Sequence, residues 1–381
     1  MKNILFIHQA AELYGSDKTL LLFLKHLDKE KYHPVVILPS EGLLKEELEK
    51  LDIKVYVAPV LKLYRDMFRL KNLIQLFKDF RKAFQIVNQL HKEYPFDIVY
   101  SNTLAVLLGA FFSKQKKLKH IWHVHEIIVH PKFLANLFPK ILNIFSGIVI
   151  CNSNSTKQNL ISRNIKLTDK TIVVYNGIEI TEPKEIFVSK SDFGFNNNDI
   201  IITLVGRISR LKGHKLVLEA IQKKFQYQKN IKFLFVGSPV PNQEYYLEEI
   251  QNIIKENNLS KQVKILPFTK DISPVWKITD IAIMPSTEAE SFGLVAAEAM
   301  LAQKPVVAAN HGGLSEIVLH KETGFLFEPN NENEFSEYLQ ILVEDKEKRE
   351  KFGITGYHRV KNKFSLEEYV KKIESVIDSL I

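Results

Sequence analysis

Short β-rich runs alternate with helical patterns along almost the whole of this 381-residue chain. In the first half, NILFIH precedes KTLLLFLKHL, HPVVILP precedes LLKEELEKL, FDIVYSN precedes LAVLLGAFF, and GIVICNS precedes TKQNLIS. The rhythm restarts at DIIITLVGR and continues through IKFLFVG, VKILPF, DIAIMPS, KPVVAAN and GFLF. Such alternation is typical of parallel βα units. The pattern therefore predicts an α/β protein with two parallel-sheet halves.

A polar interval separates the two halves. Residues 181–199 contain EPKEIF and FGFNNND, which are rich in charge, Asn and Gly, as domain linkers are. We therefore expect a Rossmann-like domain over 1–180 and a second over 181–364. Residues 365–381 form an amphipathic final helix. Ligands of such sheets bind at the carboxyl ends of the strands.

Composition is consistent with a cytoplasmic chain. The single cysteine, Cys151, ends an apolar run, so we expect a buried strand residue and no internal disulfide. The N-terminus has only a four-residue apolar run before His8, too short for a signal peptide. The apolar-rich region 133–151 is interrupted by Asn136, Pro139, Lys140 and Asn143, which argues against a transmembrane helix.

The stretch 280–300, DIAIMPSTEAESFGLVAAEAM, has the features of a phosphate and sugar site. A short apolar strand stops at Pro285, turn formers follow, and a helix-forming run begins at Gly293. A helix N-terminus attracts anions, and glycine there allows a diphosphate to approach the backbone. The carboxylates of Glu290 and Glu298 accept hydrogen bonds from hydroxyl groups on either side of such a diphosphate. Because Glu298 lies in an apolar run, we expect it to be buried with a partner.

A second chemical motif is VGRISRLKGHKLVLEAI, in which a strand ends at Gly206 and a helix begins after Gly213. Arg207 and Lys212 flank the turn between them. A fixed guanidinium and ammonium stabilise the negative charge that develops on a departing nucleoside diphosphate, without a metal ion.

The string ESFGLVAAEAM, with glutamates eight positions apart, resembles the donor-binding signature of glycosyltransferase family 4, the retaining GT-B glycosyltransferases also described as glycosyl transferases group 1. The resemblance implies a GT-B fold, with two Rossmann-like domains facing each other across a cleft. It also implies that the C-terminal helix, residues 365–381, crosses back to the N-terminal domain. It implies that Glu290 faces the donor hexose, that Glu298 holds the nucleotide ribose, and that Arg207 and Lys212 grip the diphosphate. The donor-binding residues then also include Phe292, Gly293 and Leu294.

The segment WHVHEIIVH contains two histidines that strand alternation places on one face. His123, His125 and Glu126 have ligand-like side chains, but the pattern offers no further ligand, so we expect no metal site. His125 matches the family's HE or HD position. The resemblance places its imidazole near the donor sugar and the reacting centre, where it orients hydroxyl groups and stabilises the transition state.

Other segments match the family less closely. In ELYGSDK, Gly15 and Ser16 offer backbone N–H groups to a phosphate or acceptor, although the family often has two adjacent glycines there. Asn176-Gly177-Ile178 continues with Glu179 where the family usually has Asp. HGGLSEIV provides Gly312 and Gly313, which we expect to form a flexible loop near the donor.

The net charge of +8 is unevenly distributed. Residues 1–180 carry the excess of lysine and arginine, whereas residues 181–381 are nearly neutral. Within the basic half, residues 61–92 interleave Leu, Phe and Ile with basic side chains, namely Lys62, Arg65, Arg69, Lys71, Lys78, Arg81 and Lys82. This pattern fits a helix lying in the interface of an anionic membrane, on the cytoplasmic face. It also fits an ordinary amphipathic helix packed on the N-terminal core. No nucleic-acid-binding module accompanies the charge.

The residues and the resemblance together predict a retaining, metal-independent hexosyltransferase with no cofactor. It would use a nucleotide-sugar donor, a UDP-sugar in preference to a GDP-sugar, and a glycan or lipid-linked acceptor in surface polysaccharide synthesis. Two alternatives stay open at this point. One is another GT-B enzyme, a nucleotide-sugar epimerase or a phosphorylase, and the other is a non-catalytic GT-B binding subunit.

Overall fold

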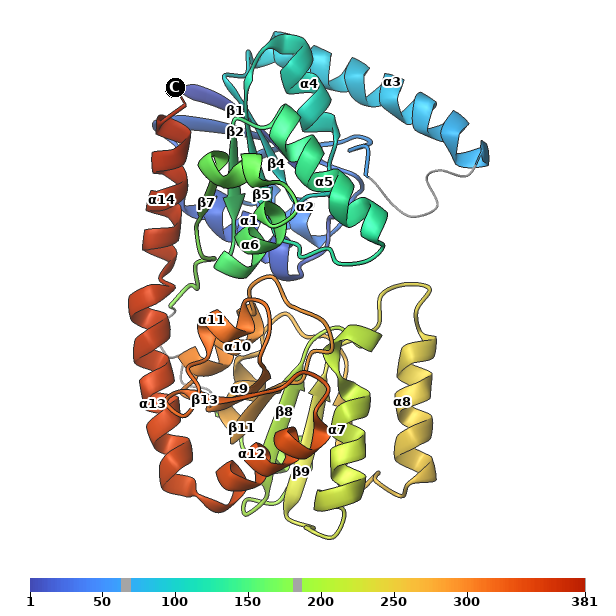
Figure 1. The fold of residues 1–381 in the computed structure, drawn as a ribbon, viewed down its shortest axis with the longest axis vertical. Coiled ribbons are helices and arrows are strands. Elements are labelled where there is room, and N and C mark those ends of the chain that lie inside the picture. The colour runs from blue at the N-terminus through green and yellow to red at the C-terminus, as the bar shows by residue number, and fades with distance from the viewer. Residues whose placement is uncertain (63–69, 181–186, 381) are drawn as a thin grey trace. The chain divides into compact units, whose positions relative to one another are not determined.

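A computed structural model describes residues 1–62, 70–180 and 187–380, with the backbone alone for residues 70–73. Arg65 and Arg69 of the basic segment and residues 181–186 of the expected linker lie outside the described residues, as does the side chain of Lys71. The described chain forms two compact units (Figure 1). Unit 1 comprises Met1–Glu179 and Leu366–Ile381, and unit 2 comprises Ile180–Ser365.

Unit 1 is built on a seven-stranded parallel sheet in the order β3-β2-β1-β4-β5-β6-β7. Its strands are β1 (Lys2–His8), β2 (Tyr32–Leu38), β3 (Lys54–Val57), β4 (Ile98–Asn102), β5 (Lys119–Val124), β6 (Ile148–Cys151) and β7 (Thr171–Val173). Its helices are α1 (Gly15–His26), α2 (Leu43–Glu49), α3 (Leu70–Glu93), α4 (Leu108–Lys116), α5 (Lys132–Phe145), α6 (Asn154–Ile161) and α14 (Leu366–Asp378).

Both faces of this sheet are covered by helices, which explains why its strands are continuous apolar runs. On one face, side chains such as Leu5, Val99 and Trp122 pack against α3, α4 and α5. On the other face, Phe6 and Tyr100 pack against α1, α2 and α14. The last helix is therefore part of the core of unit 1.

Unit 2 is built on a six-stranded parallel sheet in the order β10-β9-β8-β11-β12-β13. Its strands are β8 (Ile200–Val205), β9 (Ile231–Val236), β10 (Val263–Leu266), β11 (Ile281–Met284), β12 (Val306–Ala309) and β13 (Gly324–Phe327). Its helices are α7 (His214–Ala220), α8 (Tyr245–Glu256), α9 (Ser273–Ile278), α10 (Leu294–Leu301), α11 (Leu314–Ile317), α12 (Glu332–Glu344) and α13 (Lys346–Lys363). Its main core joins the sheet to α7, α8 and α12.

The strand order reverses once in each sheet. In unit 1 the reversal lies between β1 and β4, and in unit 2 it lies between β8 and β11. The loops that leave two such neighbouring strands diverge to opposite faces, which opens a crevice at their carboxyl ends where ligands bind in open α/β sheets. The fold therefore singles out one edge of each unit as a candidate site.

The predicted α/β class and the two parallel sheets are confirmed, and the details differ at three places. The helix expected from Leu104 begins only at Leu108, because Val106 forms a bridge with Lys62 instead. The edge strands β3 and β7 were not predicted. Helix α5 continues through Pro139, one of the residues that interrupt the apolar region 133–151. Among the helices in the described ranges, none has the length and apolar character needed to cross a membrane.

Candidate active site

The loops after β8 and β11 form the edge of unit 2 where the strand order reverses. Arg207 and Lys212 follow β8, and Glu290 follows β11. A backbone hydrogen bond of 2.9 Å from Thr287 N to Leu211 O ties the two loops together. Exposed Arg210 and Glu288 add an ion pair between the same loops. Residues nearly eighty positions apart in the sequence are thus held together at the carboxyl ends of two central strands.

Lys212 and Glu290 are in direct contact. Lys212 Nζ donates to Glu290 Oε1 over 2.7 Å, and the hydroxyl of Ser286 donates to the same oxygen. About a quarter of the Lys212 side chain and a fifth of the Glu290 side chain are exposed. Burial alone would raise the pKa of Glu290, but the charge of Lys212 and the two hydrogen bonds outweigh it and hold that pKa below its usual range.

Arg207 lies at the end of β8 with an exposed side chain, so it faces solvent at the same edge of the sheet. The stem of Lys212 passes over Gly206, where a Cβ atom would lie 3.2 Å from Lys212 Cε. Because Gly206 has no side chain, the side chain of Lys212 has room to extend toward Glu290.

Helix α10 begins directly after Gly293, whose φ of 108° is in the region that favours glycine. The N–H groups at the start of a helix have no acceptor in a preceding turn and can bind an anion. Phe292 is buried, and Leu294 is half-buried. Glu298 was expected to be buried but is half-buried. The buried residues of α10 include Ala296, Ala297 and Met300, and Glu298 is not among them.

The two glycines of HGGLSEIV have a packing role rather than the flexibility expected of them. Gly313 N donates to Glu290 O over 2.7 Å. A Cβ atom on Gly312 would lie 2.2 Å from Glu290 O, and one on Gly313 would lie 2.4 Å from the backbone of Phe292. This loop therefore packs closely on the backbone that carries Glu290.

In unit 1, the predicted residues lie at the carboxyl ends of β1 and β5. His125 follows β5 directly and is buried, with its ring centroid 3.9 Å from that of His123. The two histidines thus share a face, as strand alternation predicts. Burial lowers the pKa of His125 well below its ordinary value, and the neighbouring His123 and His8 act in the same direction.

Glu126 does not point toward a ligand set. Its Oε2 accepts hydrogen bonds from His125 N at 3.0 Å and from Leu104 N at 2.9 Å, and its Oε1 contacts Gln9 Nε2 at 3.4 Å. Burial raises the pKa of Glu126, and the backbone hydrogen bonds oppose that rise. Glu126 therefore fixes the loop that carries His125. Within the described ranges, His, Cys, Asp and Glu side chains form no group of three that would hold a metal ion.

Gly15 and Ser16 begin α1, on the loop that leaves β1. Gly15 is exposed and Ser16 is half-buried, with its hydroxyl 3.4 Å from Asp17 Oδ1. Gly177 has a structural role, because a Cβ atom there would lie 2.7 Å from Leu366 Cα and from Tyr369 Cβ of α14. Glu179 pairs with Lys25 at 2.6 Å.

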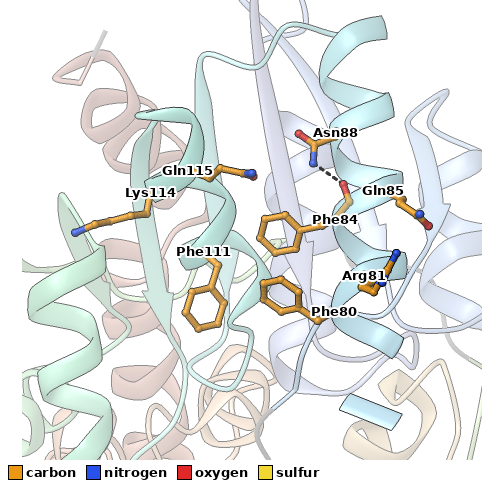
Figure 2. Close-up of a pocket in the computed structure, with 8 residues that line it drawn as sticks. All are labelled: Phe80, Arg81, Phe84, Gln85, Asn88, Phe111, Lys114 and Gln115. Atoms are coloured by element: carbon orange, nitrogen blue, oxygen red, sulfur yellow. Dashed lines mark hydrogen bonds between the residues drawn. The ribbon is translucent and has the colours of Figure 1, made fainter. Parts of the chain in front are cut away.

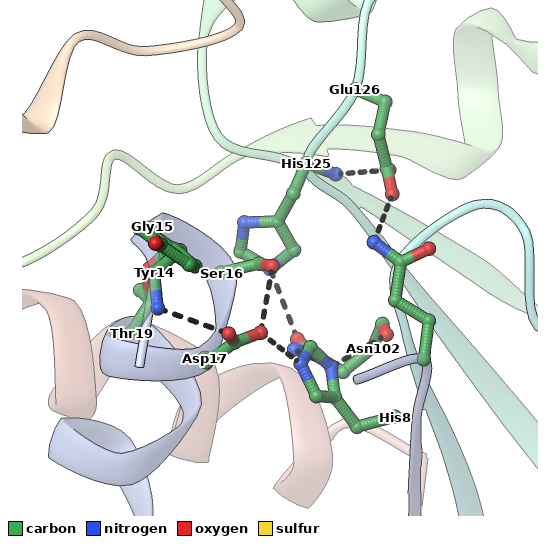
Figure 3. Close-up of polar contacts among 10 residues, drawn as sticks. His8, Tyr14, Gly15, Ser16, Asp17, Thr19, Asn102, His125 and Glu126 are labelled. Carbon is green, nitrogen blue, oxygen red and sulfur yellow. Dashed lines mark hydrogen bonds and ion pairs between the residues drawn. The ribbon is translucent and has the colours of Figure 1, made fainter. Parts of the chain in front are cut away.

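Sequence reasoning missed three buried polar residues that contact this cluster. His8 and Asn102 end β1 and β4, and Asp17 lies in the first turn of α1. Figure 3 shows their side chains together with His125. A polar residue directly after an apolar strand run, as in NILFIH and FDIVYSN, is the signal that would have found two of them.

Two parallel-sheet α/β units in succession are the architecture of the GT-B glycosyltransferases, and comparison with known proteins identifies that class. Residues 15–182 match the family described as Glycosyltransferase Family 4, and residues 186–359 match Glycosyl transferases group 1. The two matches cover most of the chain in succession. This chain belongs to glycosyltransferase family 4.

Individual relatives span nearly the whole chain. It is 26% identical to the capsular polysaccharide biosynthesis glycosyltransferase CapM of Staphylococcus aureus, over 93% of this chain and 92% of CapM. It is 28% identical to a glycosyltransferase of Methanocaldococcus jannaschii, over 88% of this chain and 87% of that protein. The crystal structure of Anabaena HepE in complex with UDP and glucose has 26% sequence identity and a TM-score of 0.86, with 100% of both chains covered.

Proposed function

We propose that this family 4 glycosyltransferase transfers a hexose-type sugar, with retention of anomeric configuration, from a UDP-sugar to a glycan or lipid-linked acceptor. The observation that carries the proposal is the meeting of Lys212 and Glu290 at the strand-order reversal of unit 2, with Arg207 and the start of α10 beside them. A nucleoside diphosphate needs cations and N–H donors, and a sugar needs carboxylate acceptors. This edge supplies both.

The comparisons support the choice of donor and pathway. HepE of Anabaena has been solved with UDP-glucose bound, at 26% identity and a TM-score of 0.85. CapM of Staphylococcus aureus acts in capsular polysaccharide biosynthesis. By analogy, we assign a UDP-sugar in preference to a GDP-sugar, and a role in the synthesis of surface polysaccharide.

In the proposed reaction, Arg207 and Lys212 stabilise the negative charge that builds on the diphosphate as the glycosidic bond breaks. Glu290 accepts hydrogen bonds from hydroxyls of the donor hexose, and Glu298 accepts those of the ribose. Phe292, Gly293 and Leu294 provide backbone and apolar contacts to the donor. His125 contacts the sugar at the reacting centre, and Gly15 and Ser16 contact a phosphate or the acceptor. This division of roles requires no metal ion and no cofactor.

The direct test is transfer from UDP-sugars to candidate acceptors, with the anomeric configuration of the product read by NMR and each reaction run with and without EDTA. The proposal predicts release of UDP, an acceptor-dependent product that keeps the donor's configuration, and full activity in EDTA. An inverted product contradicts retention, and activity that EDTA removes and Mg²⁺ restores contradicts metal independence. An isomerised donor formed without acceptor would mark an epimerase, and dependence on inorganic phosphate would mark a phosphorylase.

We also propose that unit 1 binds an anionic membrane surface on the cytoplasmic face. Helix α3 exposes Ile74 at 66% and Phe77 at 63%, and α5 exposes Phe133 at 60%. Large apolar side chains that are exposed in a group mark an interaction site more often than scattered ones do. Helices α4 and α5 contain no aspartate or glutamate, and both contain lysines.

The apolar surface continues across helices. Phe80 stacks on Phe84 with a centroid distance of 4.4 Å and contacts Phe111 of α4 at 6.0 Å, and Phe111 contacts Phe145 of α5 at 5.5 Å. Figure 2 shows the groove between α3 and α4 that these rings help to line, about 730 Å³ in volume, with Arg81 and Lys114 among its lining residues. Apolar side chains interleaved with cations match a lipid interface with anionic headgroups.

A further inference from the structure

A chain of four buried polar side chains runs across the carboxyl ends of three neighbouring strands in unit 1. Asp17 begins it in α1, His8 ends β1, Asn102 ends β4, and His125 follows β5. All four are at least nine-tenths buried, with exposures of 2%, 0%, 2% and 8%. Buried polar groups are costly unless they are paired, so the donor and acceptor of each contact are constrained.

Each member contacts the next through side-chain atoms (Figure 3). His8 Nε2 lies 2.6 Å from Asp17 Oδ1, and Asn102 Nδ2 lies 2.9 Å from His8 Nδ1. Asn102 Oδ1 lies 3.0 Å from His125 Nε2. At the other end, Asp17 Oδ2 accepts from Tyr14 N at 3.0 Å. The chain is therefore anchored in the backbone of the loop that carries Gly15 and Ser16.

The direction of the hydrogen bonds follows from the chemistry of each group. A carboxylate only accepts, so His8 donates from Nε2, and a neutral His8 keeps a lone pair on Nδ1. The amide of Asn102 donates to that lone pair through Nδ2, which leaves its oxygen to accept. His125 must then carry its proton on Nε2. Its Nδ1 has a lone pair and makes no hydrogen bond to the described part of the chain.

Resting on the proposed function, in which His125 contacts the sugar, we propose that Asp17, His8 and Asn102 are positioning residues that hold His125 as the neutral Nε2–H tautomer, so that its Nδ1 accepts a hydrogen bond from a sugar hydroxyl. Burial, which lowers the pKa of His125, keeps the ring uncharged and supports the same state. Partners of this kind, which act through a functional histidine, set which of its two nitrogens is free.

One competing arrangement is also internally consistent. If His8 were protonated on both nitrogens, Nδ1 would donate to Asn102 O, 3.1 Å away. The side-chain amide of Asn102 would be flipped, so that its NH₂ group would donate to His125 Nε2. His125 would then carry its proton on Nδ1. The two arrangements therefore predict opposite tautomers of His125.

The tautomer is measured directly by long-range ¹H–¹⁵N NMR on the full-length protein with ¹⁵N-labelled histidine, with His125 assigned from the spectrum of His125→Gln. The proposal predicts a pyridine-like Nδ1 and a pyrrole-like Nε2 for His125. His120 is an internal reference of the opposite kind, because its Nδ1 donates to Phe145 O at 2.9 Å and its Nε2 faces Ser101 Oγ at 2.9 Å. A pyrrole-like Nδ1 on His125 overturns the proposal.

A pair of variants tests the relay itself. Asn102→Ala removes both amide contacts, and we expect His125 to lose its single tautomer and kcat to fall roughly tenfold or more, as for other residues that orient a functional histidine. Ser101→Ala on the same strand removes the Ser101–His120 contact, and we expect it to change His120 and leave His125 unchanged. An unchanged His125 tautomer in Asn102→Ala contradicts the relay.

The proposed tautomer of His125 and the proposed transfer reaction are tested independently. The spectrum of the wild-type protein reports the tautomer without any substrate, so it holds even if no transfer reaction is found. If Asn102→Ala does not fold, Asn102→Leu gives the same test, because an apolar side chain of similar size neither donates to His8 Nδ1 nor accepts from His125 Nε2. Full turnover in His125→Ala would instead remove His125 from the proposed reaction and leave the tautomer assignment intact.

Discussion

Lys212 Nζ and Glu290 Oε1 lie 2.7 Å apart at the point of unit 2 where the strand order reverses. One follows β8 and the other follows β11, so the contact exists only because these two strands are neighbours. The pair therefore connects the lysine proposed to bind the donor diphosphate with the glutamate proposed to bind the donor sugar.

Lys212→Met should raise the pKa of Glu290, because burial then acts without the opposing charge. In the folded wild type this pKa is lowered, so the stabilisation that ionised Glu290 provides is full above its unfolded value, about 4.3, and is lost as pH falls through the folded value. In the variant, that loss moves to higher pH, which unfolding curves across pH measure. Lys215→Met, which breaks the exposed Lys215–Glu249 pair, is the matched control. Coincident profiles for Lys212→Met and wild type would contradict the coupling.

Glu298→Gln should weaken nucleotide binding by about 1.5 to 3 kcal/mol, the usual contribution of a hydrogen bond to a charged group. Isothermal titration with the nucleoside diphosphate measures the change. Glu219→Gln, on the exposed side of α7, is expected to bind like the wild type. If Glu298→Gln binds with unchanged affinity, the ribose assignment is wrong.

Arg207→Ala should lower turnover roughly a hundredfold, as the loss of one preorganised charge-stabilising donor does in other enzymes. Because Arg207 is exposed, its removal should change the unfolding temperature little. Arg210→Ala in the same loop retains Arg207 and Lys212 and should keep most of the activity. Steady-state kinetics decide the matter, since full turnover in Arg207→Ala would exclude it from the mechanism.

Gly213→Ala should destabilise unit 2 by more than a strained backbone alone. Gly213 has a φ of 75°, and a Cβ atom there would lie 1.8 Å from Pro285 O, in the loop after β11. Gly194→Ala has the same kind of φ, 74°, but its Cβ would meet only Lys264 Nζ at 3.5 Å. The strain at Gly194 costs about 1 to 3 kcal/mol. Thermal unfolding should show a clearly larger loss for Gly213→Ala, and equal losses would mean that the two loops are not packed as described.

The double variant Ile74→Ser, Phe77→Ser should reduce binding of the full chain to vesicles that contain anionic lipid. Both side chains are about two-thirds exposed, so folding should be little affected. Flotation at low and high salt measures the binding, which salt should weaken by screening the lysines. Tyr227→Ser, exposed at 89% in unit 2, is the control. Salt-insensitive binding, or none in the wild type, would contradict the membrane proposal.

The sequence was sufficient for the βα alternation and for the residues that follow the central strands, because central parallel strands are long apolar runs with a distinct polar end. NILFIH and DIAIMPS are of this kind and became β1 and β11. The edge strands β3 and β7 were missed, since KVYV and TIV are short and only partly buried and carry little pattern. Their strand character comes from pairing with a neighbour.

The candidate site was predicted residue by residue but not as contacts. That Lys212 pairs with Glu290, or that Asn102 lies between His8 and His125, depends on strand order, which the sequence pattern does not contain. The packing role of Gly312 and Gly313 is of the same kind, because it arises from the backbone of a distant loop. The burial of Glu298 was overestimated, because an apolar run around a glutamate gives the composition of a helix and not which of its sides faces solvent.

The most direct test of the proposed donor site is a thermal-shift titration of the purified protein with UDP, GDP and their common sugar conjugates. A ligand present at one hundred times its dissociation constant adds about 2.7 kcal/mol of stability, which shifts the unfolding temperature measurably. The proposed site predicts saturable stabilisation by UDP and UDP-sugars, weaker effects of the guanine nucleotides, and loss of the shift in Lys212→Met. The absence of a shift with every nucleotide would contradict it.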